Sequence, residues 1–481
     1  MKKQWKRCVS IAMAVGFVLS GSACAVPAED DLPKVTENPT VTEALAVTQD
    51  KEEDLSIEET KTSYGTSTQL FKAEYPEMVQ YPVTSNRDYD YEAIMAWRTS
   101  RLALQPKDTE YQNGIREFYE ITMQEFLKDT QGKNMVYSPL NVYMALALLA
   151  ETTDGDSRQQ ILALLHTDSM ETLRNNANLL WNANYCADGT VNSLLASSVW
   201  LSDKLKYNEN TLKILAENYY ASSFSGNMGS PEYNTMLQDW LNEQTGGLLE
   251  EQAQSVEMDP LTVFGLATTV YFRAKWQHEF FSKNNTEDVF HAKAGDMVTE
   301  FMHQSGTGTY YWGDNFGAIV RPLENSGNML LILPDEDVAA EDLLTDREVL
   351  DFVFDYQTYE NQKFLIVNQS VPKFDVVSDF SLISGLKNLG VEDVFDFAEA
   401  DFSPLLGDTE LPIAVNEAKH AARVMIDEEG CTAAAFTVML ACGAAMPPKD
   451  QVDFVLDRPF LFVINGQDGQ PLFVGIVNQP K

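Results

Sequence analysis

The sequence predicts an α+β fold, because helical patterns concentrate early in the chain and strand patterns late. Apolar residues recur at helical spacing from Ile115 to Leu127. Short apolar runs that are rich in β-branched residues become frequent after residue 260. With 44% hydrophobic residues and no repeat at a fixed period, the 481-residue chain can build one large core.

The N-terminus has the pattern of an export signal. Basic residues precede an apolar run over residues 9–19, which is too short to span a membrane, and small residues follow. Residues 1–24 are therefore predicted to be a signal peptide. The sequence Gly21-Ser22-Ala23-Cys24 resembles a bacterial lipobox, with glycine where leucine is usual. We expect Cys24 to be lipidated and the protein to be anchored at the surface of a bacterial cell; ordinary cleavage nearby would give a secreted, extracellular protein.

Residues 25–110 have the composition of an acidic, largely disordered tether. Pro, Thr, Glu and Asp dominate as far as Thr62, and KEEDLSIEETK is a run of charge. The part from Tyr75 to Trp97 is richer in tyrosine, so it either belongs to the tether or packs on the folded domain as an extension. The folded domain is expected over residues 111–481.

The first elements of this domain follow from helix and strand signals. Met135–Tyr137 is expected to be a short strand, followed by Ser138 as N-cap and Pro139 in the first turn of a buried, apolar helix. The further elements expected in chain order are the strand Leu194–Leu201, the helix Tyr233–Asn242, the strands Leu261–Phe272, Met329–Leu333 and Phe364–Val371, the helix Leu382–Leu389, and the strand pair Pro459–Ile464 and Leu472–Val477.

Composition and motifs argue against several classes of function. A formal net charge of -38 makes a nucleic-acid partner unfavourable. None of the five histidines lies in HExxH, and no cysteine or histidine cluster has zinc spacing. A Cys442–His420 nucleophile and base would lack an evident oxyanion donor and orienting acid. We therefore predict no enzyme, no metal and no cofactor.

The stretch from Ile426 to Pro448 carries no charge after Glu429. Read as a strand, it alternates between two faces. One face holds only small residues, namely Cys431, Ala433, Ala435 and Thr437, and the other holds Thr432, Ala434, Phe436 and Val438. A strand with one small, uncharged face can enter tightly between neighbouring strands.

Taken in order, many short patterns point to one family. They are Asn134 with Ser138-Pro139; Gly155 with Ser157; Trp240, Thr245 and Gly247; Tyr271-Phe272, Lys275-Trp276 and Phe280; Thr286, Phe290 and Met302; Leu333-Pro334; Val371-Pro372-Lys373-Phe374; Leu389-Gly390; Asp401-Phe402-Ser403; His420; Glu428 to Thr437; Arg458-Pro459-Phe460; and Asn478. From about Tyr111 to Pro480 the chain resembles the serpin family.

The resemblance implies a fold of three β-sheets and eight or nine helices with an exposed, C-terminal reactive loop. It also implies a suicide inhibitor, in which a serine protease cleaves the loop, becomes acylated and is carried along as the loop inserts into the central sheet. The implied hinge consists of Glu428, Gly430, Cys431, Thr432, Ala433, Ala434, Ala435, Phe436 and Thr437. Its small face permits insertion, although Cys431 replaces the usual Thr or Ser.

Family spacing from Glu428 puts the scissile bond at Ala444–Ala445. Because the stretch before Pro459 is longer than usual, the alternatives Met439, Leu440, Ala441 and Cys442 stay open. Small residues at this bond favour elastase-like or subtilisin-like proteases as covalent partners of a monomer.

The resemblance also implies a sheet-opening region formed by His420, Ser138, Asn141, Thr268 and Trp276. Thr268 replaces an expected Asn, and Asn141 an expected Ser. An exchange of Asn and hydroxyl between these two sites would keep a hydrogen-bond network. The alternative function is that of a non-inhibitory serpin acting as a binding or structural module.

Overall fold

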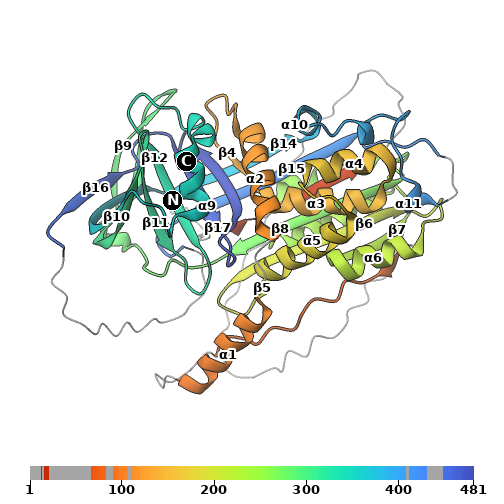
Figure 1. Ribbon diagram of the computed structural model, residues 1–481, viewed down its shortest axis with the longest axis horizontal. Coiled ribbons are helices and arrows are strands. Elements are labelled where there is room, and N and C mark those ends of the chain that lie inside the picture. The colour runs from red at the N-terminus through yellow and green to blue at the C-terminus, as the bar shows by residue number, and fades with distance from the viewer. Residues whose placement is uncertain are drawn as a thin grey trace, which may run out of the picture.

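Two nine-stranded sheets and the helices around them organise the chain in the computed structural model, which describes residues 12–13, 16–20, 67–82, 90–106, 111–407, 411–430 and 448–480 (Figure 1). This arrangement confirms the predicted α+β class. The helices are α1 (Tyr91–Leu104), α2 (Tyr111–Leu127), α3 (Pro139–Thr152), α4 (Gly155–Leu164), α5 (Met170–Asn184), α6 (Glu209–Tyr219), α7 (Pro231–Gln244), α8 (Glu250–Gln254), α9 (Arg347–Asp355), α10 (Ile383–Asn388) and α11 (Ser403–Leu406).

The first sheet carries the helical side of the molecule (Figure 1). Its strands follow the order β14 (Phe374–Ser381), β15 (Glu417–Ile426), β2 (Gly16–Ser20), β8 (Phe264–Arg273), β6 (Asn192–Ser202), β7 (Ala221–Gly226) and β3 (Thr68–Phe71). Two short strands, β1 (Ala12–Met13) and β5 (Cys186–Ala187), pair with β8 and β6.

The second sheet is built around β10, which is 18 residues long. The strand order is β16 (Gln451–Val455), β13 (Gln362–Pro372), β10 (Gly295–Trp312), β11 (Phe316–Pro322), β12 (Asn328–Pro334), β17 (Phe460–Asn465), β18 (Pro471–Val477) and β4 (Met135–Tyr137), with β9 (Thr286–Ala292) beside β10. Only the last three residues of β10 pair with β11, so β10 joins two parts that correspond to two of the three predicted sheets.

Helix α3 lies at the centre of the core, where all 14 of its residues are buried. Its start agrees with the sequence prediction, because Pro139 is in the first turn and the Ser138 hydroxyl accepts a hydrogen bond from the Asn141 amide at 3.3 Å. Apolar side chains cover every face of this helix, as expected for a helix that packs between a sheet and other helices.

The other predicted elements are also present. The structure places the predicted strands in β4, β6, β8, β12, β13, β17 and β18, and the predicted helices in α2, α3, α7 and α10, with ends within about three residues. Eleven α-helices are described where eight or nine were expected, since α1 precedes the domain and α8, α10 and α11 have six residues or fewer.

Residues 67–82 and 90–106, here called the N-terminal strap, pack against the body of the molecule. Strand β3 extends the first sheet at β7, Tyr75 stacks on Trp181, and Trp97 of α1 is buried. This packing agrees with one of the two interpretations of the Tyr75–Trp97 segment; the boundary at residue 110 stays a prediction. In the described parts of the chain, we find no helix with the length and apolarity needed to cross a membrane.

Candidate functional site

Strand β2 lies between β8 and β15 in the first sheet and is antiparallel to both. Its residues 17–20 pair with residues 265–268 of β8, and its residues 16–20 pair with residues 417–421 of β15. The strands β8 and β15 are consequently parallel to each other, and the site between them has room for one antiparallel strand. Residues 16–20 belong to the predicted signal peptide, whose removal stays a prediction.

The chain leaves β15 through a clamp formed by Trp276 and Phe280. Trp276 donates its indole N–H to the Asp427 carbonyl at 2.8 Å and its amide to the Glu429 carbonyl at 3.2 Å. The Phe280 amide donates to the Glu428 carbonyl at 2.9 Å. Three successive carbonyls are therefore fixed immediately after the end of β15, at one end of the site between β8 and β15.

Gly430 follows the clamp and turns the chain with a φ of +85°. A Cβ atom at this position would lie 2.4 Å from the Trp276 amide nitrogen. Both the left-handed backbone and the close approach require glycine. Glu428 and Gly430 of the predicted hinge thus lie at the clamp.

The rest of the predicted hinge, Cys431, Thr432, Ala433, Ala434, Ala435, Phe436 and Thr437, lies outside the described residues. The same holds for the predicted bond Ala444–Ala445, for its alternatives Met439, Leu440, Ala441 and Cys442, and for the lipidation candidate Cys24. The described chain resumes at Pro448, just before β16. The reactive bond and the lipidation site stay predictions.

A polar network holds the Glu428 side chain. Lys373 donates to Glu428 at 2.8 Å and to Glu300 at 2.9 Å, and the Asn285 amide donates to both carboxylates at 2.7 and 2.9 Å. Burial lowers the pKa of Lys373, but the hydrogen bonds to the two glutamates raise it by more, so the net shift is upward. The hydrogen bond from Asn285 is the main cause that lowers the pKa of Glu300.

Arg321 lies behind the clamp, 95% buried, with its guanidinium carbon 3.9 Å from the Phe280 ring centre and 4.8 Å from that of Trp276. It donates to Gln304, Gln369 and the His278 carbonyl. Burial lowers the pKa of Arg321 to about 9. The cation stacks on both clamp rings and so fixes their positions.

The predicted sheet-opening residues are only partly brought together. The His420 Nε2 atom accepts a hydrogen bond from the Ser138 amide at 3.2 Å, so the proton of the neutral ring is on Nδ1. Residue 17 of β2 pairs with both His420 and Thr268, which places a strand between these two positions. Trp276 belongs to the clamp instead.

The proposed exchange between Thr268 and Asn141 is not seen as a hydrogen bond. The Thr268 hydroxyl and both polar side-chain atoms of Asn141 are buried without hydrogen-bond partners among the described residues, as is the His420 Nδ1 atom. Buried polar groups usually have partners, so these atoms on α3, β8 and β15 are exceptions to that tendency.

His420 makes a testable prediction about pH. Burial lowers the pKa of His420 from 6.5 to about 3, so the unfolded chain binds a proton here at pH values where the folded chain does not. The neutral His420 ring therefore contributes its full stabilisation of the folded state above pH 6.5, and this stabilisation is lost as the pH falls towards 3. Between pH 7 and 5 we expect His420 alone to remove about 2 kcal/mol of stability.

Thermal unfolding at pH 5, 6 and 7 measures this effect as the difference in stability between wild type and His420→Gln. This difference should change with pH, because the variant should lose less stability than wild type on acidification. His278→Gln, which changes an exposed histidine, is the matched control. Parallel pH curves for wild type and His420→Gln would show that His420 is not the group that titrates.

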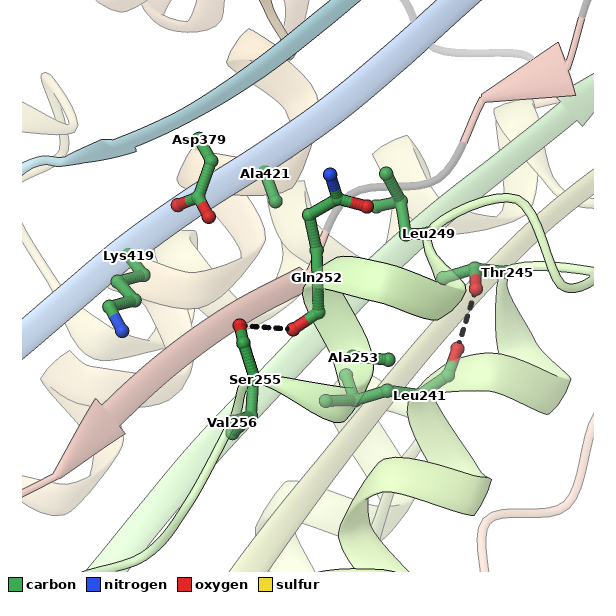
Figure 2. A pocket seen from close by; sticks show the side chains of 10 residues that line it. All are labelled: Leu241, Thr245, Leu249, Gln252, Ala253, Ser255, Val256, Asp379, Lys419 and Ala421. Carbon is green, nitrogen blue, oxygen red and sulfur yellow. Dashed lines mark hydrogen bonds between the residues drawn. The ribbon is translucent and has the colours of Figure 1, made fainter. Parts of the chain in front are cut away.

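Helices α7 and α8 cover the first sheet beside β15 and leave a small cavity there (Figure 2). The cavity has a volume of about 30 Å³, which is enough to hold a water molecule. Its walls are Leu241, Thr245, Leu249, Gln252, Ala253, Ser255 and Val256 on the helical side and Asp379, Lys419 and Ala421 on the strands. Helices α7 and α8 are therefore not fully packed against β15, which borders the site between β8 and β15.

Sequence reasoning gave no role to Lys373, Asn285, Phe280 or Arg321. Lys373 and Phe280 were part of the family resemblance, which was the only signal available for them. Asn285 and Arg321 reach the clamp through contacts between residues far apart in the chain, and composition or spacing does not reveal such contacts.

Comparisons with known proteins agree with this geometry. The profile of a family described as "Serpin (serine protease inhibitor)" matches residues 114–480. The chain is 27% identical over 365 residues to the leukocyte elastase inhibitor of Homo sapiens, with 72% of this chain and 93% of that protein covered.

Two solved structures are similar in fold. The native state of the thermophilic serpin tengpin has a TM-score of 0.66 at 23% identity and covers 78% of this chain and 95% of its own. Thyroxine-binding globulin in complex with thyroxine has a TM-score of 0.62 at 20% identity, and the match covers 76% of this chain and 98% of that chain.

Proposed function

Because this chain belongs to the serpin family, we propose that it inhibits serine proteases as a suicide substrate. The observation that carries the proposal is the strand-accepting site between β8 and β15, whose occupant β2 is antiparallel to both. A segment that leaves β15 through Gly430 and turns back would enter this site with the same polarity. Entry would give it main-chain hydrogen bonds on both sides.

The proposed reaction uses this entry to move a trapped protease. A serine protease attacks the loop, its serine forms an ester with the carbonyl carbon at the cleaved bond, and the new amine of the C-terminal part leaves. The freed hinge then inserts as a strand. At ~3.3 Å per residue, ~14 inserted residues carry the acylated protease ~45 Å.

The target class follows from the loop sequence and one relative. The stretch from Val438 to Pro448 has no lysine or arginine, which trypsin-like pockets require, and the proposed bond joins Ala444 to Ala445. The human relative is named an elastase inhibitor. Both observations support proteases with small, apolar pockets, elastase-like or subtilisin-like.

The test is incubation of the protein with pancreatic elastase or subtilisin, followed by a denaturing gel. We expect a covalent band at the summed mass of the protease and the chain without its C-terminal fragment. Trypsin is the control protease and should give no such band. Mass spectrometry of the released C-terminal fragment locates the bond. Clean cleavage of the loop with full protease activity would refute inhibition and would instead support a non-inhibitory binding or structural module.

The place of action is a second part of the proposal. We infer export through residues 1–24 and anchoring through a lipid on Cys24, with the predicted tether within residues 25–110. The support is the signal pattern and the lipobox-like sequence before Cys24.

A further inference from the structure

The site between β8 and β15 is occupied by the N-terminal part of the chain. Strand β1 pairs with residues 272–273 at the end of β8 and also lies close to β15. Strand β2 lies further along the site, where Ser20 pairs with Glu417, the first residue of β15. The strands β1 and β2 are here called the plug.

The plug begins at the clamp end of the site. Its Ala12 pairs with Arg273, three residues before Trp276 of the clamp. The plug is antiparallel to β8 and, in β2, also antiparallel to β15. A hinge that turns back at Gly430, which follows the clamp, would enter at the same end and run in the same direction. The plug and the hinge would therefore occupy the same space with the same polarity.

A fully inserted loop would reach every residue of the plug. The ~14 residues proposed to insert span ~45 Å at ~3.3 Å per residue. Strand β15 has ten residues and is therefore ~33 Å long. A loop that inserts from the clamp end thus runs along all of β15, including residues 417–421, which pair with β2. Full insertion requires that the plug leaves the sheet.

The plug has the composition that a strand in the middle of a sheet needs. Residues 9–19 contain no charge and no proline, and neither does the hinge from Gly430 to Thr437. A charge between two strands would be buried at a cost, and a proline would remove a ladder hydrogen bond. Phe17 and Val18 also favour a strand. The plug and the hinge are therefore alike in the properties that decide entry into this site.

We propose that the plug competes with the reactive loop for the site between β8 and β15. The competition rests on the proposed function, since loop insertion uses this site. While the plug is in place, the cleaved loop has to displace it before the protease is carried away. During this delay water cleaves the ester, which restores the protease serine and leaves a carboxylate on the loop. The plug lies within the predicted signal peptide, so removal of that peptide during export would make the chain an efficient inhibitor.

The first measurement locates the plug in solution. Val18 lies opposite Ala267 of β8, and opposite residues of antiparallel strands have Cα atoms ~4.5–5.5 Å apart, within reach of a disulfide. In the full chain with its five cysteines replaced by serine, Val18→Cys with Ala267→Cys should form a disulfide on mild oxidation. Val18→Cys with Val270→Cys is the control, because residue 270 lies about 10 Å further along β8. This pair should stay reduced, as mass spectrometry of digested, unreduced protein would show.

The second measurement is strand entry without a protease. A synthetic peptide with the sequence of residues 428–441 is incubated with the full chain, and the complex is followed on a native gel. Val18→Pro removes a main-chain donor from the plug and should take up the peptide about tenfold faster, the factor expected for one lost hydrogen bond. Val18→Ile keeps this donor and a β-branched side chain, so it is the matched control and should behave like wild type. Far-UV circular dichroism checks that every variant is folded.

The third measurement connects the plug to inhibition. After incubation with elastase, the ratio of covalent complex to cleaved chain on a denaturing gel should be about tenfold higher for Val18→Pro than for wild type and Val18→Ile. The reason is that insertion in Val18→Pro displaces a weaker competitor, so less of the ester is hydrolysed before the protease is carried away.

Three outcomes would overturn the competition. Absence of the disulfide between positions 18 and 267 would mean that the plug does not occupy the site in solution. Peptide uptake by Val18→Pro at the wild-type rate would mean that the plug does not hinder an entering strand. Faster uptake with an unchanged ratio on the elastase gel would mean that the plug does not compete with the loop.

Failure of the proposed function is recognised separately. If Val18→Pro takes up the peptide faster but no variant forms a covalent band with elastase, the chain is no inhibitor, although the plug still closes the site to other strands.

Discussion

Ala433→Arg is expected to turn the protein from an inhibitor of elastase into a substrate that elastase cleaves and leaves. Strand alternation puts Ala433 on the small face of the hinge, together with Cys431, Ala435 and Thr437. Insertion would bury the guanidinium without a partner, at a cost of several kcal/mol. Water then hydrolyses the ester between the protease serine and the loop before the protease is carried away. The number of inhibitor molecules consumed per protease should rise by about tenfold or more.

The matched control is Ala434→Arg, which places the same charge one residue further on, on the opposite face. This variant should keep most of the inhibition. The measurement is the stoichiometry from titration of residual elastase activity, together with the ratio of covalent complex to cleaved chain on a denaturing gel. Equal loss in both variants would contradict the assignment of the two faces.

Asp188→Ala is expected to destabilise the fold by about 3–5 kcal/mol, because it removes one partner of a buried ion pair. The carboxylate accepts hydrogen bonds from Trp97, Thr190 and Val191 in addition to its contact with Arg101. All of these donors would lose their acceptor. The midpoint of thermal unfolding, followed by circular dichroism, should fall by about 5–10 °C.

Asp203→Ala serves as the control, since it removes an equally charged but exposed side chain at the other end of β6. Its midpoint should stay within about 1–2 °C of wild type, as surface substitutions usually do. If Asp188→Ala unfolds at the wild-type temperature, the contact between the strap and the Asp188 loop does not stabilise the protein.

Much of the domain could be predicted because strong local signals agree with the fold. Ser138 and Pro139 mark the start of α3, and Pro334 and Pro372 end β12 and β13. Helix α5 was not predicted, since METLRNNANLLWNAN contains five asparagines, which are poor helix formers. Nor was β10, because Gly306 and Gly308 interrupt its strand pattern.

The functional site was less predictable than the fold. The alternation of small residues after Glu428 could be derived because it is a local property of the sequence, while the hinge that the family resemblance implies stays a prediction. The clamp could not, since Trp276 and Asp427 are 151 residues apart in the chain. The strap shows the same limit: Trp97 finds its acceptor 91 residues away, so composition indicated a tether where part of the segment is packed.

The Trp276 clamp also gives the molecule an optical property. Its indole is buried, bonded to the Asp427 carbonyl and stacked beside the Arg321 guanidinium. Indole emission depends on such polar neighbours, so departure of the hinge from the clamp changes the fluorescence spectrum of this side chain. If the proposed insertion draws the hinge out of the clamp, an unlabelled sample in a stopped-flow instrument would report this step, over the signal of the other six tryptophans, separately from cleavage of the loop.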